Sequence, residues 1–405
     1  MKNFLFIAFI FIQSNLVNAQ TYAWTQKSNF GGGTRYAAAG FSINGKGYMG
    51  LGITHVGWNY TYYNDFWEYN PATNVWTQKA NFPGQARNSS SGFAINQKGY
   101  IVLGWAPAQL NDLWEFDPVN NSWAQKTNFG GPARYDAAAF VVGNYAYVGC
   151  GYNPYQKDFW QYDPSNDSWT QIADIGGNPR SAAKGFSAGG FGYVVAGGEQ
   201  FVLYTSDLWR YNPASNLWAQ MTGMPGGPRV GPAAFSIGNL GFTGLGCTDI
   251  VVYNDFYSYD PIADAWSPVP NYPGLGRIHC VTYTIGNCAY VCAGSDSIYP
   301  GGTDRGDLWC LCDVTGVSEN NSLNNNISVS ANAAHNTLTI KFNKPNEGKA
   351  YIQIFSVNGK LINSETSKAA NEIEISTVNF SKGNYLIEIF NDRKNKIYSG
   401  KISID

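Results

Sequence analysis

One frame of three residues, Asp then Trp then Arg, recurs along most of this chain at constant spacing. The complete frames are Asp65–Trp76–Arg87, Asp112–Trp123–Arg134, Asp158–Trp169–Arg180, Asp207–Trp218–Arg229 and Asp255–Trp266–Arg277. In every one of them the step from Asp to Trp equals the step from Trp to Arg. Near the ends of this region, Trp24–Arg35 lacks its Asp and Asp307 lacks what should follow, so the two ends together supply a sixth copy. The spacing therefore predicts a closed ring of six repeats.

Each repeat holds four short strand-like runs that are separated by turn residues. A Gly follows every Arg, again at one constant spacing, at positions 52, 104, 151, 197, 246 and 294. Only the segment between this Gly and the next Asp varies in length, from the short Gly151–Asp158 to the long Gly52–Asp65. Because strand direction alternates, the Arg and the variable segment should lie at the same end of every sheet. We therefore expect any ligand site on that face, around the mouth of a central channel.

A period of about 50 residues, with four strands, a Gly near the end of the second strand and spaced aromatic residues after it, resembles the kelch repeat. The Gly-Gly doublet of that repeat occurs here only at Gly197-Gly198. The resemblance covers residues 20–313 and implies an all-β, six-bladed propeller in which residues 22–30 complete the blade begun by Asp307. The composition agrees, because 13% charged residues, 16% aromatic residues and 46 Gly are typical of a turn-rich all-β protein.

Residues 1–19 have the pattern of a secretory signal peptide. Lys2 precedes the apolar run Phe4–Ile12, and Val17-Asn18-Ala19 offers a small-residue cleavage site. The run is shorter than the ~20 apolar residues that a membrane-spanning helix needs, so no membrane span is expected. The net charge of −2, without a basic stripe, argues against binding to nucleic acid.

The composition changes after residue 313, where neither Trp nor Cys occurs again. Residues 314–326 are predicted to be an Asn/Ser-rich linker, and residues 327–405 a small β-sandwich of about seven short strands. The Asn358-Gly359-Lys360 turn, the Phe380–Tyr385 segment and the Lys-Ile-Ser-Ile ending resemble the type A C-terminal sorting domain of type IX secretion. In place of that family's usual Pro-containing opening motif stands Ser330–Ala333. The resemblance implies a Gram-negative bacterium of the Bacteroidota type, the type IX machinery as a partner, and removal of this domain with release or attachment at the cell surface.

Seven Cys are present, at positions 150, 247, 280, 288, 292, 310 and 312. An odd number leaves at least one thiol unpaired. Two interpretations stay open: a cross-strand disulfide such as Cys292–Cys310, or reduced Cys that fill the core. Neither a paired C-x-x-C motif nor a His cluster accompanies them, so no metal site and no cofactor is expected.

The six repeat Arg would surround the channel mouth. They are Arg35, Arg87, Arg134, Arg180, Arg229 and Arg277. One interpretation is an anion-recognising ring, because guanidinium groups bind carboxylates and sulfates, and the resemblance includes kelch propellers that bind acidic peptides with this Arg. The alternative is structural, because six repeat Asp begin the third strand at the same end and would neutralise the ring. We favour the structural interpretation, since a residue present in every blade usually serves the blade.

The variable segments carry aromatic side chains that are the better ligand-site candidates. These are Trp58, Tyr60, Tyr62, Trp105, Tyr152, Tyr155, Tyr204, Tyr253 and Tyr299. Flat amphipathic rings at a concave mouth suit sugar stacking or protein contacts. Any single ring could instead pack its loop onto the propeller, whereas we assign the cluster around Trp58 to function. The repeat Trp residues should be core.

Enzymatic interpretations find less support. Copper oxidases that resemble galactose oxidase need two His and two Tyr at the metal, and the propeller region has only His55 and His279, in different blades. Another six-bladed kelch group, the bacterial sialic-acid mutarotases, uses acid/base residues in the channel, for which Glu199 is the candidate here. The leading hypothesis is an exported, non-catalytic binding propeller at the cell surface or in the medium that recognises a glycan or a protein. The alternative is a carbohydrate-active enzyme of one of these two types.

Overall fold

The computed structural model describes residues 22–57, 59–200, 204–297, 302–313, 327–332, 337–342, 348–356, 361–367, 371–381, 383–392 and 396–404. Every regular element in this part of the chain is a β-strand, so the prediction of an all-β protein is confirmed. The contacts divide the chain into a compact unit, Tyr22–Asp313, and a second unit that includes Val314–Asp405. The predicted signal peptide and the predicted linker lie outside the described residues.

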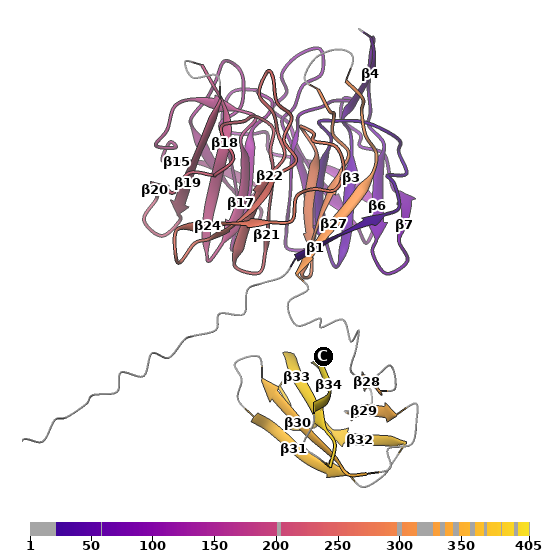
Figure 1. Cartoon of the computed structure of the whole chain (residues 1–405). Helices are drawn as coiled ribbons and strands as arrows, with labels where there is room; N and C mark the ends of the chain where they lie inside the picture. The colour runs from indigo at the N-terminus through magenta and orange to yellow at the C-terminus, as the bar shows by residue number, and fades with distance from the viewer. Residues whose placement is uncertain are drawn as a thin grey trace, which may run out of the picture. The chain divides into compact units, whose positions relative to one another are not determined.

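Among its described residues, the unit Tyr22–Asp313 contains six antiparallel sheets of four or five strands and one two-stranded sheet (Figure 1). From the inner to the outer strand, the first sheet has β2 (Ala39–Ile43), β3 (Lys46–Gly50), β6 (Phe66–Asn70) and β7 (Val75–Gln78). The second has β8 (Ser91–Ile95), β9 (Lys98–Val102), β10 (Leu113–Asp117) and β11 (Ser122–Lys126). The third has β12 (Ala138–Val142), β13 (Tyr145–Gly149), β14 (Phe159–Asp163) and β15 (Ser168–Ile172). The fourth has β17 (Lys184–Ala188), β18 (Phe191–Glu199), β19 (Thr205–Asn212) and β20 (Leu217–Met221), with β16 (Arg180–Ser181) also paired to β18. The fifth has β21 (Ala233–Ile237), β22 (Leu240–Gly244), β23 (Phe256–Asp260) and β24 (Ala265–Val269). In Figure 1 the hairpin of β4 (Ile53–Val56) and β5 (Asn59–Tyr62) projects from one end of this unit.

The sixth sheet joins the two ends of the unit. It contains β25 (Val281–Ile285), β26 (Cys288–Cys292), β27 (Leu308–Asp313) and, as its outermost strand, β1 (Tyr22–Lys27). Strand β1 runs antiparallel to β27, with Tyr22 opposite Asp313 and Lys27 opposite Leu308. A segment from the start of the repeat region thus supplies the fourth strand to the blade that contains Asp307.

The inner strands contact one another in the cyclic order β2, β8, β12, β17, β21 and β25 and surround a cavity of about 390 Å³. Their approach requires small side chains, since a Cβ added to Gly185 would lie 2.4 Å from the carbonyl oxygen of Ala139 in the neighbouring blade. Hydroxyl groups in the wall donate to carbonyls of the preceding blade, as Ser187 does to Val141 and Thr282 does to Ala234. The channel is therefore narrow, polar and tied together from blade to blade.

The repeat Trp of each outer strand links its blade to the preceding one. The indole nitrogen of Trp123 donates to the carbonyl of Ala80 at 3.0 Å. Equivalent bonds run from Trp24, Trp76, Trp169, Trp218 and Trp266 to Pro270, Ser28, Thr127, Ala173 and Thr222. The same rings pack on buried neighbours, for example Trp123 on Phe66 at 4.9 Å between centroids. The residues of the Asp–Trp–Arg frame therefore make contacts between blades as well as within them.

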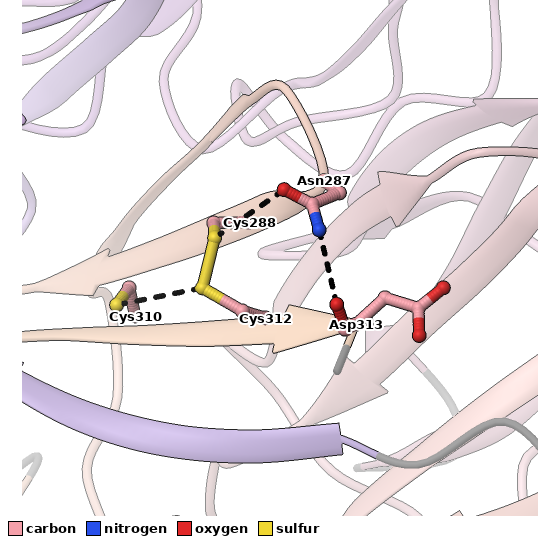
Figure 2. Close-up of a disulfide and its surroundings, with 5 residues drawn as sticks. All are labelled: Asn287, Cys288, Cys310, Cys312 and Asp313. Atoms are coloured by element: carbon pink, nitrogen blue, oxygen red, sulfur yellow. Dashed lines mark hydrogen bonds between the residues drawn. A yellow bond between two sulfur atoms is a disulfide. The ribbon is translucent and has the colours of Figure 1, made fainter. Parts of the chain in front are cut away.

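A disulfide joins the two middle strands of the sixth sheet. It links Cys288 to Cys312, which lie directly opposite each other in the β26–β27 register. Figure 2 shows this bond beside the Asn287 side chain, which donates to the carbonyl of Asp313 at 3.0 Å. The suggested Cys292–Cys310 pairing is wrong, because the register places Cys292 opposite Leu308 and Cys310 opposite Tyr290. The other five Cys are free and buried.

The C-terminal unit contains two sheets. The first consists of β28 (Ile327–Asn332), β29 (Thr337–Phe342) and β32 (Glu372–Ser376); the second consists of β31 (Leu361–Ser367), β30 (Ala350–Ser356), β33 (Gly383–Phe390) and β34 (Lys396–Ile404). Alternating apolar residues such as Ile340, Ile352 and Ile387 form a common buried core. Strand β28 pairs along β29 from Ile327 opposite Phe342 to Asn332 opposite Thr337.

Candidate functional site

All six repeat Arg are buried, with at most 1% of the residue exposed. Each makes a two-pronged contact with the repeat Asp of its own blade. In the third sheet, the two terminal nitrogens of Arg134 lie 2.5 and 2.9 Å from the carboxylate oxygens of Asp158, and Arg134 also donates to the carbonyl of Cys150. The other pairs are Arg35–Asp65, Arg87–Asp112, Arg180–Asp207, Arg229–Asp255 and Arg277–Asp307. These guanidinium groups are occupied within their blades, which supports the structural interpretation of the ring.

Glu199, the candidate base from the sequence, belongs to the same network. Its carboxylate lies 2.8 Å from a terminal nitrogen of Arg180 and accepts a hydrogen bond from Asn178 at 2.8 Å. The residue is 6% exposed. Both carboxylate oxygens are therefore engaged in holding the Arg180 loop, and this residue is poorly placed to remove a proton from a ligand.

A closed cycle of backbone hydrogen bonds encircles the channel mouth, two residues after each Arg. The bonds run from the amide of Ala37 to the carbonyl of His279, and onward through Gly231, Ala182, Asp136 and Ser89 back to Ala37. All six residues have φ between 49° and 58°, a left-handed conformation that most side chains adopt at a cost. We call these six residues the mouth ring.

Polar side chains occupy only some positions of the mouth ring. Asp136 and His279, from the third and sixth blades, face each other, with His279 Nδ1 3.7 Å from Asp136 Oδ1. Burial lowers the pKa of His279, Asp136 opposes this shift, and the Lys184 ammonium adds to it. His279 is therefore largely neutral at physiological pH and can donate or accept a hydrogen bond.

Aromatic rings from the second and third blades form a continuous row beside this pair. Centroid distances are 5.4 Å for Trp105–Tyr135, 5.5 Å for Tyr135–Tyr152 and 4.9 Å for Tyr152–Tyr155. All four side chains are partly buried. We call them the aromatic row; it unites three of the rings that the sequence suggested.

A second group lies at the seam between the first and sixth blades. The His55 ring contacts Tyr36 and Tyr60 at 5.9 and 6.1 Å, and its Nδ1 lies 3.3 Å from Asp304 Oδ2, with side chains 6% and 4% exposed. Within the described residues, both His55 ring nitrogens and Asp304 Oδ1 lack a hydrogen-bond partner of good geometry. Buried polar atoms normally have partners, so this pair has unused hydrogen-bonding capacity. Burial, with Asp304 as the next cause, raises the pKa of Tyr36 to about 12.

The remaining aromatic candidates do not join the aromatic row. Tyr60 is 46% exposed on the projecting hairpin, and Tyr62 lies on β5 of the same hairpin. The Tyr253 ring stacks on Arg229 at 3.8 Å, and the Tyr204 hydroxyl donates to Asp249 at 2.5 Å. Trp58 and Tyr299 lie outside the described residues, so the proposed role of the cluster around Trp58 stays a prediction.

Two family models match this chain. The KLHDC2/KLHL20/DRC7 Kelch-repeats domain matches residues 59–192, and the Secretion system C-terminal sorting domain matches residues 331–405. Residues 59–192 thus match a kelch-repeat model, and the end of the chain matches a C-terminal sorting domain. Both resemblances inferred from the sequence are thereby confirmed, and the sorting domain indicates export in a Bacteroidota-type bacterium.

The fold of the kelch propeller also matches solved structures. That of YjhT covers 70% of this chain and 96% of its own, with a TM-score of 0.58 and 15% sequence identity. At this identity the likeness shows the fold alone. No curated protein matches the sequence.

Two kinds of feature are absent from the described residues. They contain no group of three or more His, Cys, Asp or Glu placed to hold a metal ion. Nor do the described residues include a helix that is long and apolar enough to cross a membrane.

Sequence reasoning missed several residues that belong to the channel mouth. Tyr36 and Tyr135 directly follow a repeat Arg, and Asp136 directly follows Tyr135. The signal was present as a departure from the repeat, because the four other blades have Asn88, Ser181, Val230 and Ile278 after the Arg. The aromatic ligand-site candidates were instead chosen from the variable loops, because only these segments differ in length between repeats.

Proposed function

We propose that this protein is a secreted, non-catalytic binding propeller that recognises a glycan at the channel mouth. The aromatic row carries the proposal, because it places four partly buried rings from two blades beside the polar Asp136–His279 pair. Sugar rings stack their apolar faces on aromatic side chains and direct their hydroxyls to nearby polar groups. A row of rings with polar groups beside it fits that requirement.

The repeat geometry supports this assignment. The Arg–Asp pairs occur in every blade and satisfy one another, whereas the aromatic row occurs in one sector only. A feature that the blade does not need in its other copies is free to serve a ligand. A non-catalytic binding propeller could also recognise a protein through the same rings, and the test below distinguishes this outcome.

A glycan array with the mature chain tests the proposal. We expect Trp105→Ala and Tyr152→Ala each to weaken glycan binding about three- to tenfold, the effect of one lost ring contact. Tyr145→Ala is the matched control, because Tyr145 is 38% exposed at the start of β13, away from the mouth. Equal binding by the three variants would show that the aromatic row is not part of the glycan site. A blank array combined with saturable, ring-dependent binding of a protein would assign the site to protein recognition.

A carbohydrate-active enzyme is the second candidate, and the two His–Asp pairs favour it. His279 with Asp136, and His55 with Asp304, place imidazoles beside carboxylates at the mouth, an arrangement suited to proton transfer. Incubating reducing sugars with the protein and following their anomers by NMR would detect such chemistry. Catalysed exchange that Asp136→Asn abolishes would replace the binding proposal by this one.

We further propose that the propeller acts outside the cell, on the surface or in the medium. The sorting domain and the sequence pattern of residues 1–19 support this placement. Fractionation of producing cells should find the propeller outside the outer membrane, and a chain that ends at Asp313 should remain inside. Retention of the full chain in the periplasm would contradict it.

A further inference from the structure

Lys184 interrupts the pattern of the inner strands. The first residue of the inner strand is Ala39, Ser91, Ala138, Ala233 or Val281 in the other blades. The Lys side chain in the fourth blade is partly buried and lines the central cavity. It is the only Lys or Arg among the described residues that line this cavity. A small residue suffices at this position elsewhere, so the blade does not need the charge.

Among the described residues, no carboxylate oxygen lies within 4.0 Å of the Lys184 ammonium group. Salt bridges within 4.0 Å connect the repeat Arg to their Asp, but none reaches Lys184. Its neighbours Cys280 and His279 supply no negative charge: burial raises the pKa of the Cys280 thiol to about 11, and burial lowers the pKa of His279. Asp136 lies against His279 instead. A partly desolvated cation without a partner favours the arrival of an anion.

The cavity wall supplies the second half of a site. Hydroxyl groups such as those of Ser187, Ser236 and Thr282 already donate to carbonyls of neighbouring blades. Their oxygens retain lone pairs that accept hydrogen bonds from a ligand. The cavity, at about 390 Å³, lies in the volume range of small-molecule sites. Lys184 thus stands as one cation among acceptor groups that suit the hydroxyls of a sugar.

We propose that the channel is a subsite for an acidic sugar, in which Lys184 binds the carboxylate or sulfate group and the wall hydroxyls accept from the sugar hydroxyls. This inference rests on the proposed glycan function and names the chemical class of the ligand. The repeat Arg cannot take the anion, because each guanidinium is already held by its own Asp. The charge that discriminates ligands therefore comes from a single blade.

Binding of glucuronate, glucose 6-sulfate and glucose, at constant ionic strength, tests this subsite in the mature chain. We expect the wild type to bind at least one acidic sugar more tightly than glucose. Lys184→Ala, which restores the residue type of other blades, should lower that affinity about tenfold or more and leave glucose affinity unchanged. Lys184→Arg should retain most of the preference. Comparison of the two acidic sugars tells whether the carboxylate or the sulfate is recognised.

Lys157→Ala is the matched control, because Lys157 lies in a variable segment and its ammonium is 3.8 Å from Asp174. An acidic-sugar preference that survives Lys184→Ala, or that Lys157→Ala abolishes equally, overturns the subsite. Glucose binding without any acidic preference in the wild type also overturns it while leaving the glycan function in place. Inorganic sulfate is the sugar-free probe. If sulfate stabilises the wild type but not Lys184→Ala against thermal unfolding, and none of the sugars binds, the result supports the subsite and rejects the glycan function.

Discussion

The Asp–Trp–Arg frame and the mouth ring are only two residues apart in sequence, yet they obey opposite rules. The frame repeats the same side chains in every blade, and the structure pairs them internally. The mouth ring repeats only its backbone conformation and hydrogen bonds, while its side chains range from Gly231 to His279. Positions that repeat in side chain hold the propeller together, and positions that repeat only in backbone are free to bind a ligand.

Acidification should break the frame most severely, because it acts on several blades together. Burial alone would raise the pKa of Asp112 and Asp158, but hydrogen bonds and charge from their Arg partners outweigh it and lower the pKa of each. A depressed pKa in the folded state contributes stability that is present above the unfolded value, about 4, and is lost as pH falls through the folded value. The urea midpoint should therefore fall steeply below about pH 4.

His279 provides the internal control for this titration. Because burial lowers its pKa, the unfolded chain binds its proton more readily, and stability should begin to decline below about pH 6.5. His279→Asn, which tolerates the left-handed conformation, should remove this early decline and keep the steep one. A midpoint that is constant from neutral to strongly acidic pH would contradict both assignments.

Arg134→Ala tests the frame in one blade. The substitution leaves the Asp158 carboxylate without its buried partner and should cost about 3–5 kcal/mol in the free energy of unfolding. Thermal and urea denaturation measure this loss, and ligand affinity well below the melting temperature should be retained. Unchanged stability with lost ligand affinity would return the Arg ring to a recognition role.

Removal of the disulfide tests the sheet that joins the two ends of the propeller. Replacing Cys288 and Cys312 together by Ala should cost about 3 kcal/mol, the usual effect for a loop of this size. Cys247→Ala is the control, since that thiol is buried and free. Hydrogen exchange should show the loss first in β1 and β27. Equal effects of the two changes would mean that the bond adds nothing beyond packing.

Trp123→Phe gives the smallest expected change in the frame. It removes the hydrogen bond to Ala80 while retaining much of the ring packing, and should cost about 1 kcal/mol. Asp136→Asn in the mouth ring should change stability by less, because the repeat frame does not use that carboxylate. A larger effect for Asp136→Asn than for Trp123→Phe would overturn the contrast between the two sets of positions.

The candidate site was only partly accessible to sequence reasoning. The variable segments led to Trp105, Tyr152 and Tyr155, which the structure brings into one row with Tyr135. Tyr135 and Lys184 were overlooked because they lie within the regular repeat, where an alignment of the six copies shows them only as exceptions. Glu199 was named only as the candidate base of the enzymatic alternative, and its contact with Arg180 could not be inferred from spacing.

The blades could be predicted from the amino-acid sequence, because strand alternation, turns and the Asp–Trp–Arg frame are local patterns that repeat at a fixed spacing. The short alternating strands of the C-terminal unit were readable for the same reason. Only the tertiary structure showed which residues that depart from the repeat lie in contact. Asp136 and His279 come from opposite blades, and Cys288 pairs with Cys312 because the strand register places them opposite each other. Such meetings depend on how sheets pack around an axis and on which residues oppose each other in a ladder, and local spacing encodes neither.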